Sequence, residues 1–109
     1  MIFYSLYDYS DIYSCVKLYI NNTEETFIIV NGNLNYNKTV SLRWLKFPIN
    51  YLRIYNNMIT INPFQNYKKY LYDSSFILRK YNDKFYFETC KKNDYYLSYK
   101  EQKIIDTPD

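Results

Sequence analysis

Apolar and polar positions alternate along most of this chain with the period of a β-strand. In the segment Val40–Phe47, the side chains of Val40, Leu42 and Trp44 share one face and the residues between them share the other, which predicts a half-buried strand. Similar segments of about five to eight residues recur between turn signals. The predicted strands are Ile2–Tyr7, Tyr13–Ile20, Thr26–Val30, Val40–Phe47, Tyr51–Tyr55, Met58–Asn62, Ser75–Lys80, Phe85–Cys90, Tyr95–Tyr99 and Lys103–Ile105.

Asparagine marks most of the expected turns. The chain has a single glycine, so the backbone positions with positive φ fall mostly to asparagine, which tolerates the left-handed region better than other residues with a side chain. The clearest case is Asn56-Asn57, which stands between the segments Tyr51–Tyr55 and Met58–Ile61. This spacing predicts a two-residue hairpin with a type I′ turn.

The segment from Pro63 to Ser74 is the one region without a strand pattern that is long enough to hold a helix. Tyr67 and Leu71 are four residues apart, which permits a helical turn. Its cluster of tyrosines and its flanking proline favour an irregular aromatic loop instead. We therefore predict no helix in the chain.

Composition supports an all-β fold. The chain of 109 residues has 16 Tyr and 7 Phe and no Ala, so residues that suit a pleated surface replace the best helix former. The length fits one domain over residues 1–109. The net charge of +3 is small and its lysines and arginines are scattered, which argues against nucleic acid as a partner.

The residue types that carry most catalytic chemistry are scarce. The chain has no histidine, a single glycine and no serine-centred nucleophile motif, so we expect no enzyme activity and no cofactor. Cys15 and Cys90 lie too far apart in sequence for metal-ligand spacing, and we expect free thiols and no metal. No segment approaches the length of a membrane span, and we expect no membrane insertion.

A second hairpin is predicted at Phe85–Tyr99, with Phe87 and Leu97 buried. In it, the triplet Phe87–Thr89 and the triplet Tyr96–Ser98 stand on either side of a short turn. This spacing resembles the signature of the interleukin-1 cytokine family. Upstream segments, among them Thr26–Val30 and Asn82–Phe85, resemble the interleukin-18 member of that family.

The resemblance implies a β-trefoil-like barrel of the interleukin-1 type, reduced to about ten strands. Relative to that family, the chain starts at the second strand and stops before the last, so a pair of barrel strands is missing. An open barrel leaves unpaired backbone groups along its edges. We therefore expect either a smaller resealed barrel or a homodimer through the unpaired edge.

The resemblance also implies a function and a site. It points to a non-enzymatic cytokine-like binding protein, a viral mimic or antagonist, whose partner is an interleukin-1-family receptor or the protein that sequesters interleukin-18. The implied contacts are Asn82, Asp83, Lys84, Phe85 and Lys103. The expected location is outside the cell, by a route without a conventional signal peptide, or the host cytoplasm.

Two other hypotheses remain open from the sequence. The first is an intracellular β-barrel module for protein interaction, encoded by an AT-rich DNA virus and without cytokine activity, because one fold can host many unrelated sites. The second and weaker one is binding of single-stranded nucleic acid through aromatic faces.

Overall fold

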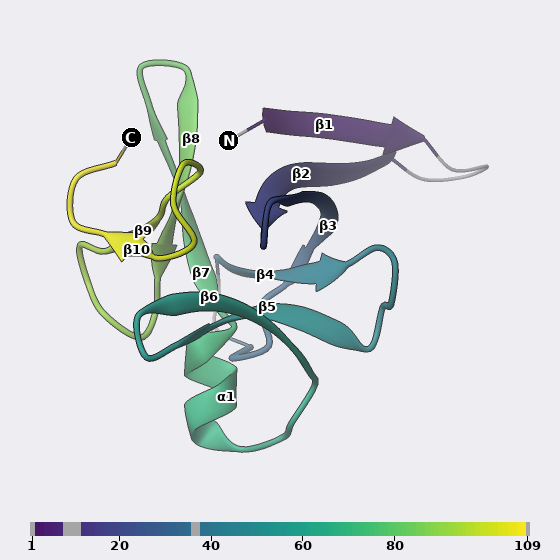
Figure 1. Cartoon of the computed structure of the whole chain (residues 1–109), viewed down its shortest axis with the longest axis vertical. Coiled ribbons are helices and arrows are strands. Elements are labelled where there is room, and N and C mark those ends of the chain that lie inside the picture. Colours follow the sequence, from purple (N-terminus) through teal and green to yellow (C-terminus); the bar gives the residue numbers. More distant parts are fainter. Residues whose placement is uncertain (1, 8–11, 36–37, 109) are drawn as a thin grey trace.

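The computed structural model describes residues 2–7, 12–35 and 38–108, and within them it contains ten strands and one short helix (Figure 1). The elements are β1 (Ile2–Tyr7), β2 (Ile12–Ile20), β3 (Thr23–Asn31), β4 (Thr39–Trp44), β5 (Asn50–Tyr55), β6 (Met58–Pro63), α1 (Lys68–Asp73), β7 (Phe76–Tyr81), β8 (Lys84–Thr89), β9 (Tyr96–Leu97) and β10 (Ile104–Ile105).

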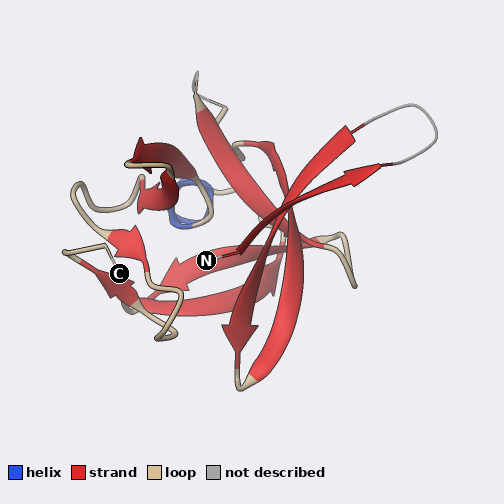
Figure 2. Ribbon diagram, turned by 90° about the horizontal axis from the view of Figure 1, so that it is seen from above, coloured by secondary structure: helices blue, strands red, loops and turns tan. Residues whose placement is uncertain are grey.

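All ten strands belong to one antiparallel sheet. Hydrogen bonding follows the order β1-β2-β3-β4-β7-β8-β9-β10, and β5 and β6 branch from β4 as a hairpin. Figure 2 shows that this sheet curls around a common centre, in the form of a half-barrel. The predicted all-β class is therefore confirmed.

The segment from β4 to β7 forms a unit in which the outer strands pair while a hairpin stands between them in sequence. Val40 of β4 lies opposite Phe76 of β7, and β5 and β6 pair over their whole length. At the tip of that hairpin, Asn56 and Asn57 have φ angles of 50° and 62°. The hairpin and its type I′ turn are confirmed as predicted.

Asparagine takes the role that glycine plays in most turns. Of the nine residues with positive φ in the described part of the chain, six are asparagine. The single glycine, Gly32, is not among them. It is required for space instead, because a Cβ at this position would overlap the side chain of Thr39.

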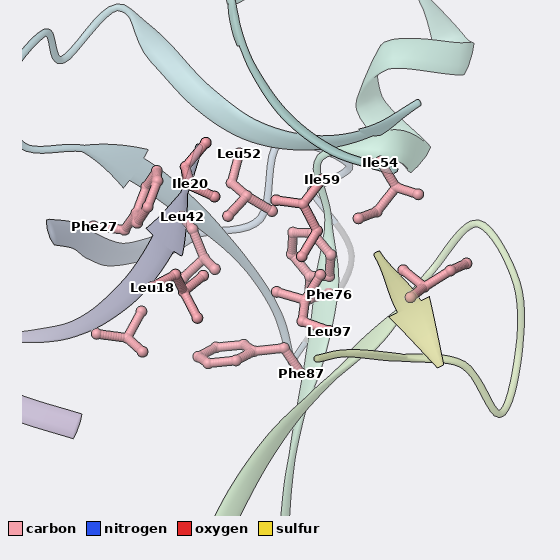
Figure 3. Packing of buried hydrophobic residues seen from close by; sticks show 12 residues of the cluster. Leu18, Ile20, Phe27, Leu42, Leu52, Ile54, Ile59, Phe76, Phe87 and Leu97 are labelled. Carbon is pink, nitrogen blue, oxygen red and sulfur yellow. The ribbon is translucent and has the colours of Figure 1, made fainter. Parts of the chain in front are cut away.

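The core lies inside the curl and draws on strands from β2 to β10 (Figure 3). Val40 and Trp44 pack partly buried against it and Leu42 is fully buried, which confirms the predicted face of that strand. Phe87 and Leu97 are buried as predicted. The cluster consists of Val16, Leu18, Ile20, Phe27, Leu42, Leu52, Ile54, Ile59, Phe76, Phe87, Leu97 and Ile104.

The absence of a helix was a wrong prediction, because α1 forms inside the expected loop. Its first turn closes through the Leu71 N–H, which donates to Tyr67 O at 3.1 Å. The helix is held by Tyr70, which is fully buried and donates its hydroxyl hydrogen to Asn62 O at 2.9 Å. Tertiary burial of one tyrosine therefore decides the structure of a segment with weak local preference.

Some strand limits also differ from the prediction. β3 starts at Thr23, three residues early, and β4 ends at Trp44, so that Leu45 to Phe47 lie in the following loop. Strand β9 has only two residues because the chain turns at Ser98, whose side-chain oxygen accepts hydrogen bonds from the Lys100 and Glu101 N–H groups.

Two further expectations concern the thiols and the sheet edges. Cys15 and Cys90 are free, as predicted. The hydrogen-bonded path runs from β1 to β10, and a homodimer through an unpaired edge stays a prediction that a molar mass in solution tests. No helix in the described ranges has the length and apolarity that a membrane crossing requires.

Candidate functional site

Trp44 and Glu25 form the centre of the candidate site, which we call the Trp44 site. Trp44 is the last residue of β4 and lies opposite Phe27 of β3. Because alternate residues of a strand share a face, Glu25 lies on the same side as Phe27. The Oε2 atom of Glu25 accepts a hydrogen bond from the indole Nε1 of Trp44 at 2.8 Å. The neighbouring Phe27 is fully buried. This bond fixes the orientation of the indole ring.

A hollow of about 460 Å³ lies beside this pair. Its walls come from the end of β2, the β2–β3 turn, β3, β4, β6 and the loop before β10, so it forms only when the sheet curls. Ile20, Asn21, Thr23, Glu25, Trp44, Thr60, Ile61 and Gln102 line it.

Gln102 joins three segments at the rim of the hollow. Its side-chain Nε2 donates to Ile59 O at 2.8 Å, and its Oε1 accepts from the Asn21 N–H at 2.9 Å. One amide therefore ties the loop before β10 to β6 and to the β2–β3 turn, so the walls keep their spacing.

Several polar groups in the hollow remain available to a ligand. The side chains of Asn21 and Thr23 have no hydrogen-bond partner among the described residues, and Glu25 uses only Oε2 there. Glu25 is also the one acidic or basic residue in the lining. An aromatic wall with hydroxyl, amide and carboxylate groups suits a small ligand that has an apolar face and several hydroxyls.

A second, smaller hollow of about 180 Å³ adjoins the first. The two share Trp44 and Glu25, and the second also includes Lys46. Its complete lining is Glu24, Glu25, Thr26, Trp44, Leu45 and Lys46.

A group of charged residues around α1, which we call the Asp73 cluster, is another place where side chains from several elements meet. Asp73 is 1% exposed. Its Oδ2 lies 3.0 Å from Arg53 Nε and 3.4 Å from Lys69 Nζ, and its Oδ1 lies 3.1 Å from Lys91 Nζ. The cluster therefore ties α1 to β5 and to the loop after β8.

Aromatic rings enclose the guanidinium of this cluster. The Arg53 group stands 5.0 Å from the ring centre of Tyr55 and 5.1 Å from that of Tyr70. Desolvation lowers the pKa of Arg53, but the hydrogen bond and charge of Asp73 outweigh it and raise the pKa above its ordinary value.

Among the described residues, no three His, Cys, Asp or Glu side chains converge as metal ligands.

The residues predicted as partner contacts lie in two separate elements. Asn82 and Asp83 form the turn between β7 and β8 with φ angles of 47° and 66°, and Lys84 and Phe85 begin β8. Lys103 instead lies just before β10, where its Nζ pairs with Glu101 at 3.3 Å. Neither group lines a hollow described above.

Trp44, Glu25 and Gln102 did not enter the predicted site. Two features of the sequence could have indicated this site. The single tryptophan lies on a half-buried strand, and the strand before it carries the acidic residue Glu25. Pairing of those two strands sets the register that brings Glu25 to the indole. Gln102 carried no signal, because its contact with Asn21 spans 81 positions of the sequence.

Comparison with known proteins identifies one related family. The family model of the Alpha-L-arabinofuranosidase B (ABFB) domain matches residues 17–78. This range covers more than half of the chain, and it includes seven of the eight residues that line the larger hollow. No curated protein and no solved structure matches the chain.

The interleukin-1 resemblance is therefore wrong, and so are the cytokine function and the alternative of a viral interaction module. The match leaves out the hairpin 85–99, whose motif residues have local structural roles. Glu88 accepts the Asp94 N–H at 2.8 Å, and the Thr89 hydroxyl oxygen accepts the Lys92 N–H at 3.1 Å. The spacing that suggested a cytokine thus corresponds to a hydrogen-bonded connection between β8 and β9. The chain belongs to the Alpha-L-arabinofuranosidase B (ABFB) domain family.

Proposed function

We propose that this chain binds carbohydrate in the hollow beside Trp44. The observation that carries the proposal is the Trp44 indole, fixed by Glu25 at 2.8 Å in a hollow of about 460 Å³ with polar groups at its rim. The family supports it, because its name refers to an enzyme that acts on α-L-arabinofuranosides.

The chemistry of a sugar matches this lining. A sugar ring has a face of C–H groups that packs against an aromatic ring, and an edge of hydroxyls that both donate and accept hydrogen bonds. The side chains of Asn21 and Thr23 and the carboxylate of Glu25 surround Trp44 with such partners. Since the indole is already held by Glu25, binding requires little ordering of this side chain.

The proposed activity is binding without hydrolysis. Glycoside hydrolysis ordinarily uses two carboxylates about 5 to 9.5 Å apart, one on each side of the scissile bond. Glu25 is the single carboxylate in the lining of the larger hollow. Glu24, in the smaller hollow, forms an ion pair with Lys17 at 3.4 Å. An assay for release of reducing sugar tests this part, and turnover would contradict it.

The test of binding uses the fluorescence of the single tryptophan. Titration of the whole chain with α-1,5-linked L-arabino-oligosaccharides is expected to give a saturable change in Trp44 emission. Thr23→Val, which removes one exposed hydroxyl, is expected to weaken binding about fivefold, the equivalent of one hydrogen bond. Trp44→Phe, followed by calorimetry, is expected to weaken it further.

Tyr81→Ala is the matched control, because Tyr81 is 49% exposed and lies at the β7–β8 end outside both hollows. Its affinity is expected to equal that of the unchanged chain. Equal affinity of Thr23→Val, Trp44→Phe and the control would place binding elsewhere, and absence of binding by the unchanged chain would reject the proposal for this sugar class.

A β-trefoil arrangement is the finer part of the fold that we propose. It is supported by the unit from β4 to β7, in which the outer strands pair at Thr39 with Ile77 and at Val40 with Phe76 around the β5–β6 hairpin. Strand β8 followed by the β9–β10 pair begins a second unit of the same kind. An experimental structure without threefold pseudosymmetry would contradict this assignment.

A further inference from the structure

We infer that the Trp44 site takes two consecutive units of a neutral glycan, one on each side of Trp44. This inference rests on the proposed function and specifies its ligand. It starts from the two adjoining hollows, which share two residues, Trp44 and Glu25. A ligand that fills both must pass the indole.

The shared wall is rigid because three interactions fix it. Trp44 Nε1 donates to Glu25 Oε2 at 2.8 Å, and the ring of Phe47 packs edge-on against the indole with 5.1 Å between ring centres. The next backbone group, Leu45 N–H, donates to Thr26 O at 3.0 Å and keeps the ends of β3 and β4 together. The two hollows therefore keep their relative position.

The sizes of the hollows assign one unit to each. The smaller hollow, at about 180 Å³, is below the roughly 300 Å³ at which pockets for drug-sized ligands begin, so it suits a single sugar ring. The larger one, at about 460 Å³, has the greater number of polar groups and takes the first unit. A third unit would extend beyond both hollows into solvent.

The charges select neutral sugars. Glu25 is the one acidic or basic residue in the larger hollow, which is therefore acidic, whereas in the smaller one Glu24 pairs with Lys17 and Glu25 is accompanied by Lys46. The chain as a whole carries a charge of +3, so this acidic character is local. Uronic acids and sulfated sugars bring a negative charge next to Glu25, and like charges at short distance oppose binding.

The experiment compares ligands of increasing length on the full chain. Methyl α-L-arabinofuranoside, α-1,5-linked L-arabinobiose and α-1,5-linked L-arabinotriose supply one, two and three units, and Trp44 fluorescence is the readout. Affinity is expected to rise at least about fivefold from one unit to two and less than about twofold from two to three. Digalacturonic acid is expected to bind at least about fivefold more weakly than arabinobiose.

Variants specific to one hollow sharpen this comparison. Lys46 lines only the smaller hollow, and Lys46→Ala is expected to remove the gain from the second unit and leave the affinity for one unit unchanged. Lys84→Ala is the matched control, since Lys84 is also an exposed lysine and lines neither hollow. Its affinities are expected to equal those of the unchanged chain.

Each outcome separates this inference from the proposed function. Equal affinity for one, two and three units overturns the two-unit site and leaves carbohydrate binding standing. Equal affinity for digalacturonic acid and arabinobiose overturns the selection of neutral sugars. Loss of one-unit binding in Lys46→Ala overturns the assignment of the first unit to the larger hollow. Absence of binding by every probe overturns both the inference and the proposed function.

Discussion

The Trp44 site and the Asp73 cluster use the same residue types in opposite ways. Each contains a carboxylate and aromatic rings contributed by several elements of the fold. Around Asp73, three cations converge on the carboxylate and its side chain is 1% exposed. At Trp44, one carboxylate oxygen of Glu25 accepts one indole N–H, and neighbouring polar groups have no partner among the described residues.

The difference separates a structural ion cluster from a binding site. In the Asp73 cluster the charged groups bind each other inside the fold, so they have little capacity left for a ligand, although the Trp44 site contains similar residue types. Groups that are held in place but only partly engaged keep that capacity and need little reorganisation on binding. We therefore expect substitutions in the Asp73 cluster to change stability, and those in the Trp44 site to change affinity.

The largest expected effect comes from Asp73→Ala. It leaves Arg53, whose side chain is 11% exposed, together with Lys69 and Lys91, without their shared carboxylate. Removal of one partner from a buried ion pair costs about 3 to 5 kcal/mol of unfolding free energy. Urea unfolding followed by circular dichroism measures this loss.

Asp83→Asn is the matched control for Asp73→Ala. The Asp83 side chain is 99% exposed and pairs with Lys80 at 3.9 Å, and asparagine tolerates the φ of 66° at this turn position, so the free energy of unfolding is expected to change by less than about 0.5 kcal/mol. If both variants lose the same stability, the Asp73 cluster does not have the structural role that the comparison assigns to it.

Glu88 extends the comparison to a buried carboxylate with fewer partners. Its Oε1 accepts Arg79 Nε at 2.8 Å and its Oε2 accepts the Asp94 N–H at 2.8 Å. Burial raises the pKa of Glu88, but the bonds from Asp94 and Arg79 outweigh it and hold the pKa below its ordinary value of 4.5. Glu88→Gln is expected to lose about 2 kcal/mol at neutral pH.

The direction of the Glu88 pKa shift determines how the stability of the chain depends on pH. Because the pKa is lower in the folded chain, the stability from Glu88 is complete above pH 4.5 and is lost as the pH falls through the folded value. Chemical unfolding at a series of acidic pH values is expected to bring Glu88→Gln and the unchanged chain together. A constant difference down to the lowest pH would contradict this role.

Tyr70 makes a smaller contribution to the free energy of unfolding, and this contribution is lost at high pH. Its hydroxyl donates to Asn62 O at 2.9 Å, and burial raises its pKa from 10.0 to about 12. The stability from the neutral hydroxyl is therefore complete below pH 10.0 and is lost as the pH rises toward about 12. Tyr70→Phe is expected to lose about 1 kcal/mol at neutral pH and to remove one late step from the absorbance titration of tyrosine.

The sequence predicted the strands well because their pattern is local. The alternation around Leu42 and the asparagine pair at Asn56-Asn57 specify a strand face and a turn within a few residues, and both were found. The helix was missed because Tyr70 is buried against the β5–β6 hairpin, through Asn62 and Arg53, and the pattern of the helical segment itself does not report this packing. A local motif also led to the wrong family, because its residues have local roles in the turn after β8, where Glu88 accepts the Asp94 N–H.

The candidate site was missed for a related reason. Its residues come from β2 to β6 and from the loop before β10, so their meeting depends on the curl of the sheet and on pairing between distant segments. Gln102 illustrates this, since its two contacts bridge to Asn21 and Ile59, 81 and 43 positions away. Sequence reasoning identified half-buried faces but not which of them border the same hollow.

The smallest effect on stability is expected from Glu25→Gln, and it tests the comparison at the Trp44 site itself. The amide oxygen of glutamine still accepts the Trp44 Nε1–H that Glu25 accepts at 2.8 Å, so unfolding free energy is expected to change by about 0.5 kcal/mol or less. The charge beside the ligand is removed, and affinity for arabinobiose is expected to fall while discrimination against digalacturonic acid narrows. Fluorescence titration of both ligands measures this, and a variant that loses stability but keeps its selectivity would show that Glu25 acts like Asp73.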